Sequence, residues 1–126
     1  MLEWDSYFNV QNTRITVKNN DAKIVFKGLK TGSSNQTANL KSIKDFSCWI
    51  LEEAEELEDQ TLYEKISLSV RGNSKESGKP NINVLILNPV TREHWIYKHF
   101  FEERQVSEGF NGVKDNICYI HTSTRS

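Results

Sequence analysis

An apolar segment that ends in two adjacent acids constrains the fold of this chain more than any other feature. Residues Phe46 to Leu51 form an apolar run that is too short to span a membrane. Its aromatic and β-branched residues predict a fully buried strand at the centre of a sheet. Glu52 and Glu53 follow the run directly. Because ligands bind just beyond the carboxyl ends of the strands in an open α/β sheet, the two carboxylates stand where a ligand is expected.

Two interpretations of these acids remain open. In the first they form a Walker B pair, in which Glu52 holds Mg²⁺ through water and Glu53 orients or deprotonates the water that attacks the γ-phosphate of ATP. In the second they belong to the acidic segment 52–59, which lies in solvent at a helix start and is favoured there by the helix dipole alone.

Composition narrows the class of protein. The chain has 126 residues, the usual size of one domain, and a net charge of −1, so it lacks the basic excess of an autonomous nucleic-acid binder. No signal peptide and no apolar run of about 20 residues is present, which predicts a soluble cytoplasmic protein without a membrane partner. Cys48 and Cys118 have no metal-binding spacing and are predicted to be buried free thiols.

Periodic segments flank the acidic turn. Arg14 to Val17 and Ala22 to Lys27 have alternating apolar positions and predict a β-hairpin. Thr61 to Glu64 fits a capping box, and it opens a predicted helix that ends at Gly72. The apolar face of that helix recurs at four-residue steps, at Leu62, Ile66 and Val70.

A second predicted strand, Ile82 to Leu87, breaks at Asn88-Pro89. The Asn88 carboxamide can reach a water or a phosphate oxygen there, or it can simply be a turn residue before proline. Thr91 to Glu103 predicts a helix whose aromatic residues pack, and Ile117 to Thr122 predicts a last strand. We expect a three-layer α/β domain in which the three strands share one sheet and the first two are parallel.

The Gly72 to Lys79 segment does not fit a phosphate-binding loop. Five residues separate Gly72 from Gly78 where the loop needs four, and Pro80 stands where a Ser or Thr hydroxyl should bind Mg²⁺. Lys79 is therefore interpreted as a solvated loop lysine.

An ordered set of segments resembles the large terminase subunit of tailed phages, in the family that is also found in defective prophages. These segments are FKGL (26–29), NLKSIK (39–44), WILEEAEEL (49–57), SVRG (69–72), LILNPV (85–90), HWIYKHFF (94–101) and YIHTS (119–123). The resemblance runs over about residues 10–124, which is nearly the whole chain.

The resemblance implies a function and a set of roles. The family is similar to other P-loop motor ATPases: an ATPase domain drives double-stranded DNA into the capsid with ATP and Mg²⁺, together with a small terminase subunit and a portal. Carried onto this chain, its Walker B acids fall on Glu52 and Glu53, its ATPase-coupling motif falls on Asn88 and Pro89, and its arginine at the end of the intervening helix falls on Arg71.

The resemblance also implies that residues 1–126 are one partial P-loop NTPase-like domain, the C-terminal portion of the ATPase domain. The family's Walker A loop should lie upstream of the hairpin and its nuclease domain should follow Thr122, and neither is within these residues. We therefore expect a fragment that is inactive alone, and that covers the free edge of its central strand by self-association or with its own hairpin. The alternatives are a terminase remnant that serves only as a protein-interaction module, and an unrelated α/β domain with a structural acidic turn.

Overall fold

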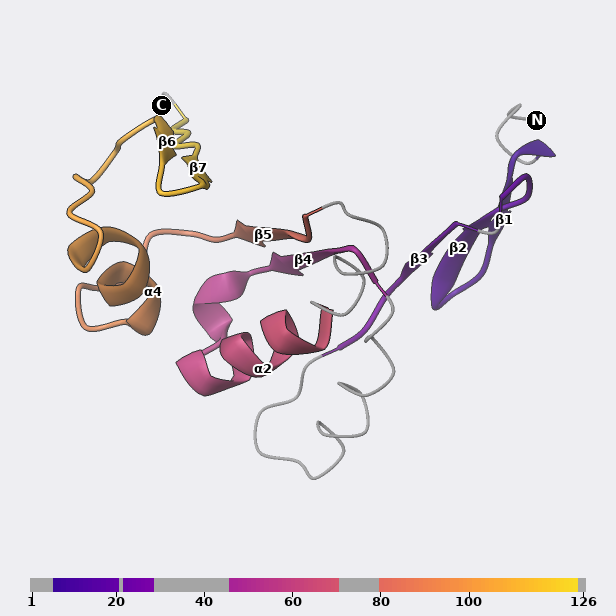
Figure 1. The fold of residues 1–126 in the computed structure, drawn as a ribbon, viewed down its shortest axis with the longest axis horizontal. Helices are drawn as coiled ribbons and strands as arrows, with labels where there is room; N and C mark the ends of the chain where they lie inside the picture. Colours follow the sequence, from indigo (N-terminus) through magenta and orange to yellow (C-terminus); the bar gives the residue numbers. More distant parts are fainter. Residues whose placement is uncertain (1–5, 21, 29–45, 71–79, 125–126) are drawn as a thin grey trace. The chain divides into compact units, whose positions relative to one another are not determined.

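The computed structural model describes residues 6–20, 22–28, 46–70 and 80–124. The chain divides into two units, Met1–Lys41 and Ser42–Ser126. The described part of the first unit is an antiparallel sheet in the order β1-β2-β3 (Figure 1). Its strands are β1 (Phe8–Val10), β2 (Arg14–Val17) and β3 (Lys23–Val25).

The predicted N-terminal hairpin is confirmed. Ile15 of β2 pairs with Ile24 of β3, and the Val17 amide donates to the Ala22 carbonyl oxygen at 2.7 Å. The strand β1 adds to this hairpin along the other edge of β2. Its three residues, Phe-Asn-Val, alternate between apolar and polar but are too few to predict a strand from the sequence.

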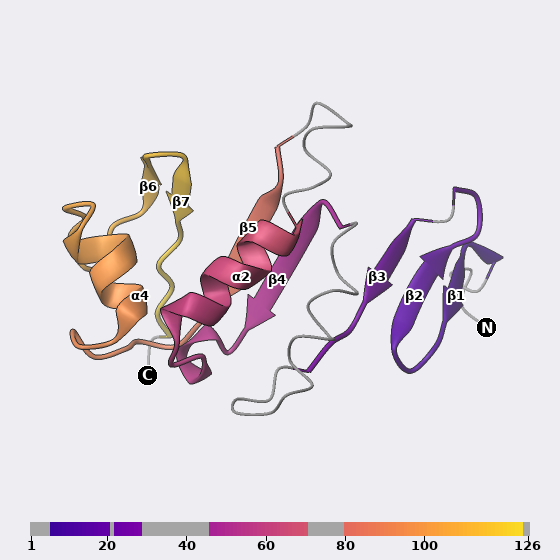
Figure 2. The same ribbon diagram turned by 60° about the horizontal axis from the view of Figure 1, so that its bottom comes forward.

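A parallel strand pair forms the centre of the second unit. The strands β4 (Cys48–Glu52) and β5 (Ile82–Ile86) pair from Cys48 opposite Ile82 to Glu52 opposite Ile86. The helix α2 (Gln60–Val70) lies in the connection between them and on one face of the pair (Figures 1 and 2). The prediction that these two strands are parallel is confirmed.

Packing holds α2 against that face. The rings of Trp49 and Tyr63 lie 5.7 Å apart between centroids, and the Asn83 carboxamide donates to the Ser67 hydroxyl at 3.3 Å. The predicted apolar stripe of the helix is the buried one, with Leu62, Ile66 and Val70 at 7%, 2% and 0% exposure. This stripe is part of the hydrophobic core of the unit.

The start of α2 differs from the prediction. The Asp59 carboxylate accepts a hydrogen bond from the Thr61 amide at 2.8 Å, and the helix begins at Gln60. Asp59 therefore caps the helix, and the capping box predicted to open at Thr61 is wrong. Gly72, the predicted end of the helix, lies outside the described residues.

The prediction that the central strands are fully buried is also wrong. Burial alternates along β4, and the face turned away from α2 leaves Ile50 63%, Ile82 56% and Ile86 54% exposed. Among the described residues of the second unit, α2 covers one face of the pair and no helix or strand packs on the other face. Cys48 lies on this open face, so it is a free but exposed thiol, and Cys118 is likewise free and exposed.

The last part of the second unit is a helix followed by a hairpin. The short helix α4 (Trp95–Tyr97) continues as the π-helix η3 (Lys98–Glu102), in which the Glu103 amide donates to the Lys98 carbonyl oxygen at 2.9 Å. The hairpin consists of β6 (Gly112–Lys114) and β7 (Ile117–Tyr119), which are antiparallel. The prediction that the last strand joins the sheet of β4 and β5 is wrong, because β7 pairs with β6 instead.

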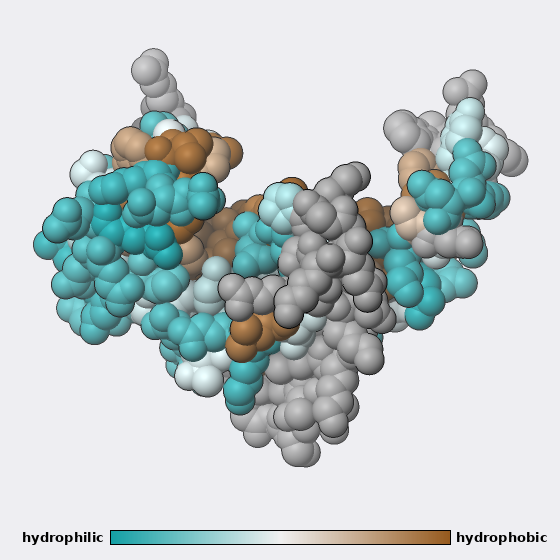
Figure 3. All heavy atoms as spheres, viewed as in Figure 1, coloured by the Kyte–Doolittle hydropathy of each residue, from teal (hydrophilic) through white to brown (hydrophobic). Residues whose placement is uncertain are grey.

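Local turn chemistry explains that pairing. Asp115 and Asn116 have φ of 53° and 64°, the left-handed backbone of a tight two-residue hairpin turn, which Asp and Asn tolerate better than most residues. The Tyr119 hydroxyl donates to the Phe100 carbonyl oxygen at 2.6 Å and fixes the hairpin to the helix. Hydrophobic side chains gather on the surface over this hairpin (Figure 3), where Val113 and Ile120 are 70% and 79% exposed.

The fold class follows from these elements. The described residues form one parallel pair, one helix packed on it and two antiparallel sheets, which is a mixed α/β structure as predicted. Within the described ranges, no helix has the length and apolarity needed to cross a membrane.

Candidate functional site

A sharp turn separates the two predicted acids. Glu52 is the last residue of β4, and Glu53 has the left-handed values φ 54° and ψ 48°. The Glu53 carbonyl oxygen accepts from the Glu56 amide at 2.9 Å and opens the 3₁₀-helix η2 (Ala54–Glu56). A non-glycine residue in this conformation costs about 1 kcal/mol or more, so the surrounding structure must hold it. Both acids are exposed.

Glu55, a residue not predicted from the sequence to belong to the site, contacts Asn88. Its Oε1 lies 2.8 Å from Asn88 Nδ2, and its Oε2 lies 3.2 Å from the Asn88 backbone nitrogen. The turn after β4 is thereby joined to the turn after β5. The structure brings Asn88 to the acidic turn, as expected from parallel strands, and it gives Asn88 a partner that is neither of the two predicted acids.

His94 makes a second connection to this turn. Its Nδ1 accepts a hydrogen bond from the Ile96 amide at 3.1 Å, so Nε2 carries the proton and donates to the Glu55 carbonyl oxygen at 3.0 Å. His94 is half-buried. Its position as N-cap of α4 and its bond to the acidic turn could not be read from the sequence, because the two partners are far apart in the chain.

A third connection is buried. The Trp95 indole N–H donates to the carbonyl oxygen of Leu57, and these two residues are 8% and 4% exposed. The Tyr63 ring lies 5.1 Å from Trp95 and 5.9 Å from Phe100 between centroids. Trp95 is therefore a packing residue, as predicted.

Hydrogen bonds favour the ionised form of Glu55. Donation by its own backbone amide is the main cause that holds the pKa of Glu55 below its ordinary value; burial opposes it, and donation by the side chain and backbone of Asn88 lowers the pKa further. Glu55 is therefore a carboxylate at neutral pH.

The donor set at the turn suits a magnesium ion that keeps most of its waters. Mg²⁺ is bound in nucleotide sites by one or two carboxylates together with phosphates and water, and Glu52 and Glu53 offer exposed carboxylates of this kind. No group of three or more His, Cys, Asp or Glu side chains in the described ranges could hold a metal by itself.

A comparison with protein families matches the whole chain. The sequence pattern described as phage terminase large subunit covers residues 1–126. The chain belongs to the phage terminase large subunit family. No curated protein matches it in a search of individual sequences.

The structure describes three of the residues to which the family resemblance gives a role. The fourth, Arg71, lies outside the described residues, and so does the loop residue Lys79. Glu52, Glu53 and Asn88 are described, and all three stand at the carboxyl end of the β4–β5 pair.

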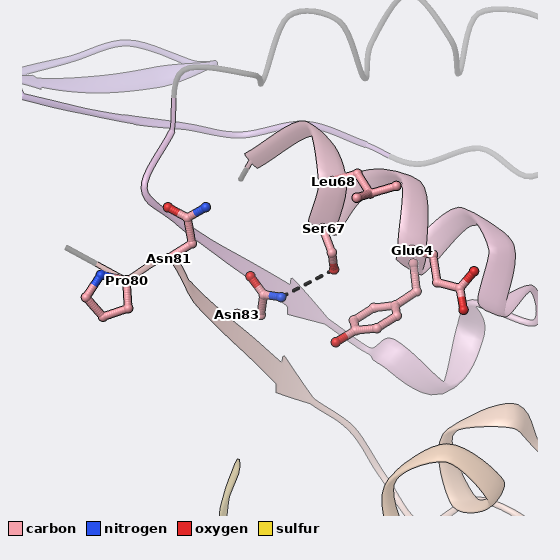
Figure 4. Close-up of a pocket in the computed structure, with 7 residues that line it drawn as sticks. Glu64, Ser67, Leu68, Pro80, Asn81 and Asn83 are labelled. Carbon is pink, nitrogen blue, oxygen red and sulfur yellow. Dashed lines mark hydrogen bonds between the residues drawn. The ribbon is translucent and has the colours of Figure 1, made fainter. Parts of the chain in front are cut away.

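A pocket lies elsewhere on the terminase chain (Figure 4). It is lined from α2 by Tyr63, Glu64, Ser67 and Leu68, from the segment before β5 by Pro80 and Asn81, and from β5 by Asn83. The acidic turn contributes none of these residues. The pocket is therefore separate from the predicted acids.

Proposed function

We propose that this chain supplies the Walker B portion of the ATPase that drives DNA packaging by a phage or prophage terminase. One observation carries the proposal. In a chain of the terminase large subunit family, Glu52 and Glu53 leave one strand of a parallel pair at the same end at which Asn88 follows the other strand. This is the end of an α/β sheet at which ligands bind.

The proposal assigns a role to each residue. Glu52 would hold Mg²⁺ and Glu53 would polarise the attacking water, while Asn88 would reach that water or a phosphate oxygen and Arg71 would contribute a positive charge. The bound ion would neutralise charge on the β- and γ-phosphates of ATP. The complete domain is proposed to be a three-layer, P-loop-like fold.

The chain is proposed to be incomplete as an ATPase. Phosphoryl transfer depends on positioning and charge neutralisation by a glycine-rich loop and its lysine, and residues 1–126 contain no G-x-x-x-x-G-K-S/T segment. Another polypeptide or segment would have to supply that loop. The nuclease domain, the small terminase subunit, the portal and double-stranded DNA would be partners of the assembled motor.

The test measures ATP hydrolysis by the pure chain and by the chain joined to a segment that carries the phosphate loop. The pure chain should hydrolyse ATP no faster than buffer, and the joined enzyme should turn over with Mg²⁺. The flanking DNA should then contain an upstream reading frame that ends in such a loop. Steady hydrolysis by the pure chain, or none by any joined enzyme, would refute the proposal.

The open face of the β4–β5 pair supports a second candidate function, that of a protein-interaction module. Parallel sheets are normally covered on both faces, yet Ile50 and Ile82 are more than half exposed here. Sedimentation at several concentrations should then show association that Ile50→Lys abolishes, while Val113→Lys, on the C-terminal hairpin, leaves it unchanged. Concentration-independent monomers would rule out self-association through this face.

A further inference from the structure

The Asn88 carboxamide is held by its nitrogen end. The Glu55 carboxylate accepts hydrogen bonds from the Asn88 side-chain amide, at 2.8 Å, and from the Asn88 backbone N–H, at 3.2 Å. An ionised carboxylate accepts hydrogen bonds and donates none, so Glu55 can bind Nδ2 and cannot bind Oδ1. Because Oδ1 and Nδ2 lie on opposite sides of Cγ, the carboxamide oxygen is turned away from Glu55.

Glu55 is itself fixed in place. His94 Nε2 lies 3.0 Å from its carbonyl oxygen, and the Ile96 amide holds the His94 ring through Nδ1. The left-handed turn at Glu53 sets the direction in which η2 leaves the strand. The orientation of the exposed Asn88 side chain thus depends on a half-buried histidine and on one carboxylate.

We propose that Glu55 is a positioning residue that decides which end of the Asn88 carboxamide faces the reaction, an inference that rests on the proposed ATPase function. With Nδ2 held by Glu55, Asn88 offers Oδ1, and the partner of that oxygen is a hydrogen-bond donor such as the attacking water. A phosphate oxygen only accepts, so it is not the partner of Oδ1. Asn88 therefore orients water, and Glu55 acts on the reaction through Asn88.

Three variants separate orientation from structure. In Glu55→Gln, the new amide donates to Asn88 Oδ1 after that carboxamide turns over, and the new oxygen accepts the Asn88 backbone N–H, so two hydrogen bonds persist while Nδ2 faces outward. Asn88→Asp places two carboxylates against each other and loses the side-chain bond. The double variant Glu55→Gln/Asn88→Asp restores both bonds and again leaves a free acceptor oxygen.

The first readout uses the chain alone. In ¹H–¹⁵N spectra, the chemical shifts of the Asn88 side-chain amide should change with pH as Glu55 titrates. This pH-dependent change should disappear in Glu55→Gln and persist in Glu56→Gln. Glu56 is an exposed neighbour and serves as the matched control. An Asn88 amide that ignores the Glu55 titration would overturn the inference whatever the ATPase assay gives.

The second readout is turnover by the enzyme joined to a phosphate-loop segment. Glu55→Gln should remain folded at the assay temperature and keep the KM for ATP but lose about a hundredfold in kcat, the loss expected from a misplaced positioning group. Asn88→Asp should lose both stability and turnover, the double variant should regain both, and Glu56→Gln should match the wild type. If the wild-type enzyme is active and Glu55→Gln keeps its kcat, the positioning role is refuted and the proposed function stands; an inactive wild-type enzyme refutes both.

Discussion

Glu52 stands directly opposite Ile86 in the parallel register of β4 and β5. The acidic turn and the segment that contains Asn88 therefore begin at the same level of the sheet. Four hydrogen bonds then join the two segments, two from Asn88 and one each from His94 and Trp95 to the turn after β4. The roles proposed for Glu52, Glu53 and Glu55 can be tested by substituting each acid separately.

The two adjacent acids should differ in effect in the joined enzyme. Glu53→Gln keeps the shape of the side chain but loses the charge that polarises water, so kcat should fall by about a thousandfold while nucleotide still binds. Glu52→Gln should instead raise the Mg²⁺ concentration needed for nucleotide binding. Steady-state kinetics and a nucleotide-binding titration over a range of Mg²⁺ concentrations measure the two effects. Indistinguishable behaviour of the two variants would contradict the assignment.

Two buried indole nitrogens, in Trp95 and in the half-buried Trp49, provide a test of the connection between the segments. Trp95→Phe leaves the Leu57 carbonyl oxygen without its donor and should lower the free energy of unfolding by about 1–3 kcal/mol more than Trp49→Phe does. Trp49 is the matched control, because its buried Nε1 has no hydrogen-bond partner among the described residues. Urea unfolding of both variants checks this, and equal losses would mean that the Trp95 bond contributes nothing.

The helix cap can be assigned by a pair of alanine substitutions. Asp59→Ala should cost about 0.5–2 kcal/mol of stability, since the Asp59 carboxylate caps the Thr61 amide. Thr61→Ala should cost less, because Thr61 lies one residue inside the helix. Thermal unfolding measures both, and the reverse order would restore the capping box predicted from the sequence.

Stability should depend on pH through Glu55. Since the pKa of Glu55 is lower in the folded chain than its ordinary value, the unfolded chain binds its proton more readily, and folding gains stability as pH rises. This contribution is complete above the ordinary Glu pKa of about 4.3 and is lost as pH falls through the lower folded value. Glu55→Gln should remove that part of the pH profile in urea unfolding. Glu58→Gln, at an exposed neighbouring carboxylate, should keep it.

The sequence predicts local and strongly periodic features well. Short repeats of apolar residues predict the hairpin of β2 and β3 and the buried stripe of α2. They also predict the parallel pairing of β4 and β5, the two strands that α2 connects. The β6–β7 hairpin is not predicted because its strands have three residues each, although Asp115-Asn116 is a recognisable turn signal.

Burial and long-range polar contacts are predicted less well. An apolar run indicates that a strand can be buried, but not how many layers cover it, so the exposure of Ile50 and Cys48 is not foreseen. The pairing of Glu55 with Asn88 depends on the turn at Glu53. The left-handed backbone of that turn could not be predicted, because glutamate does not indicate such a conformation. The sequence predicts that Glu52, Glu53 and Asn88 lie at the same end of the sheet, and it misses Glu55, the residue that holds Asn88.

The parallel register also affects how this chain folds during its synthesis on the ribosome. Every rung of β4 and β5 joins residues whose numbers differ by 34. At a synthesis rate of about 5–20 residues per second, β5 follows β4 by about 2–7 s, whereas a hairpin such as β6–β7 closes in about 1–10 μs once both strands exist. During that interval α2 is synthesised but β5 is not, so β4 lacks its partner strand, and its backbone edge and Ile50 are open to any other nascent chain. Crowded translation is therefore the condition under which this molecule is most exposed to misassembly.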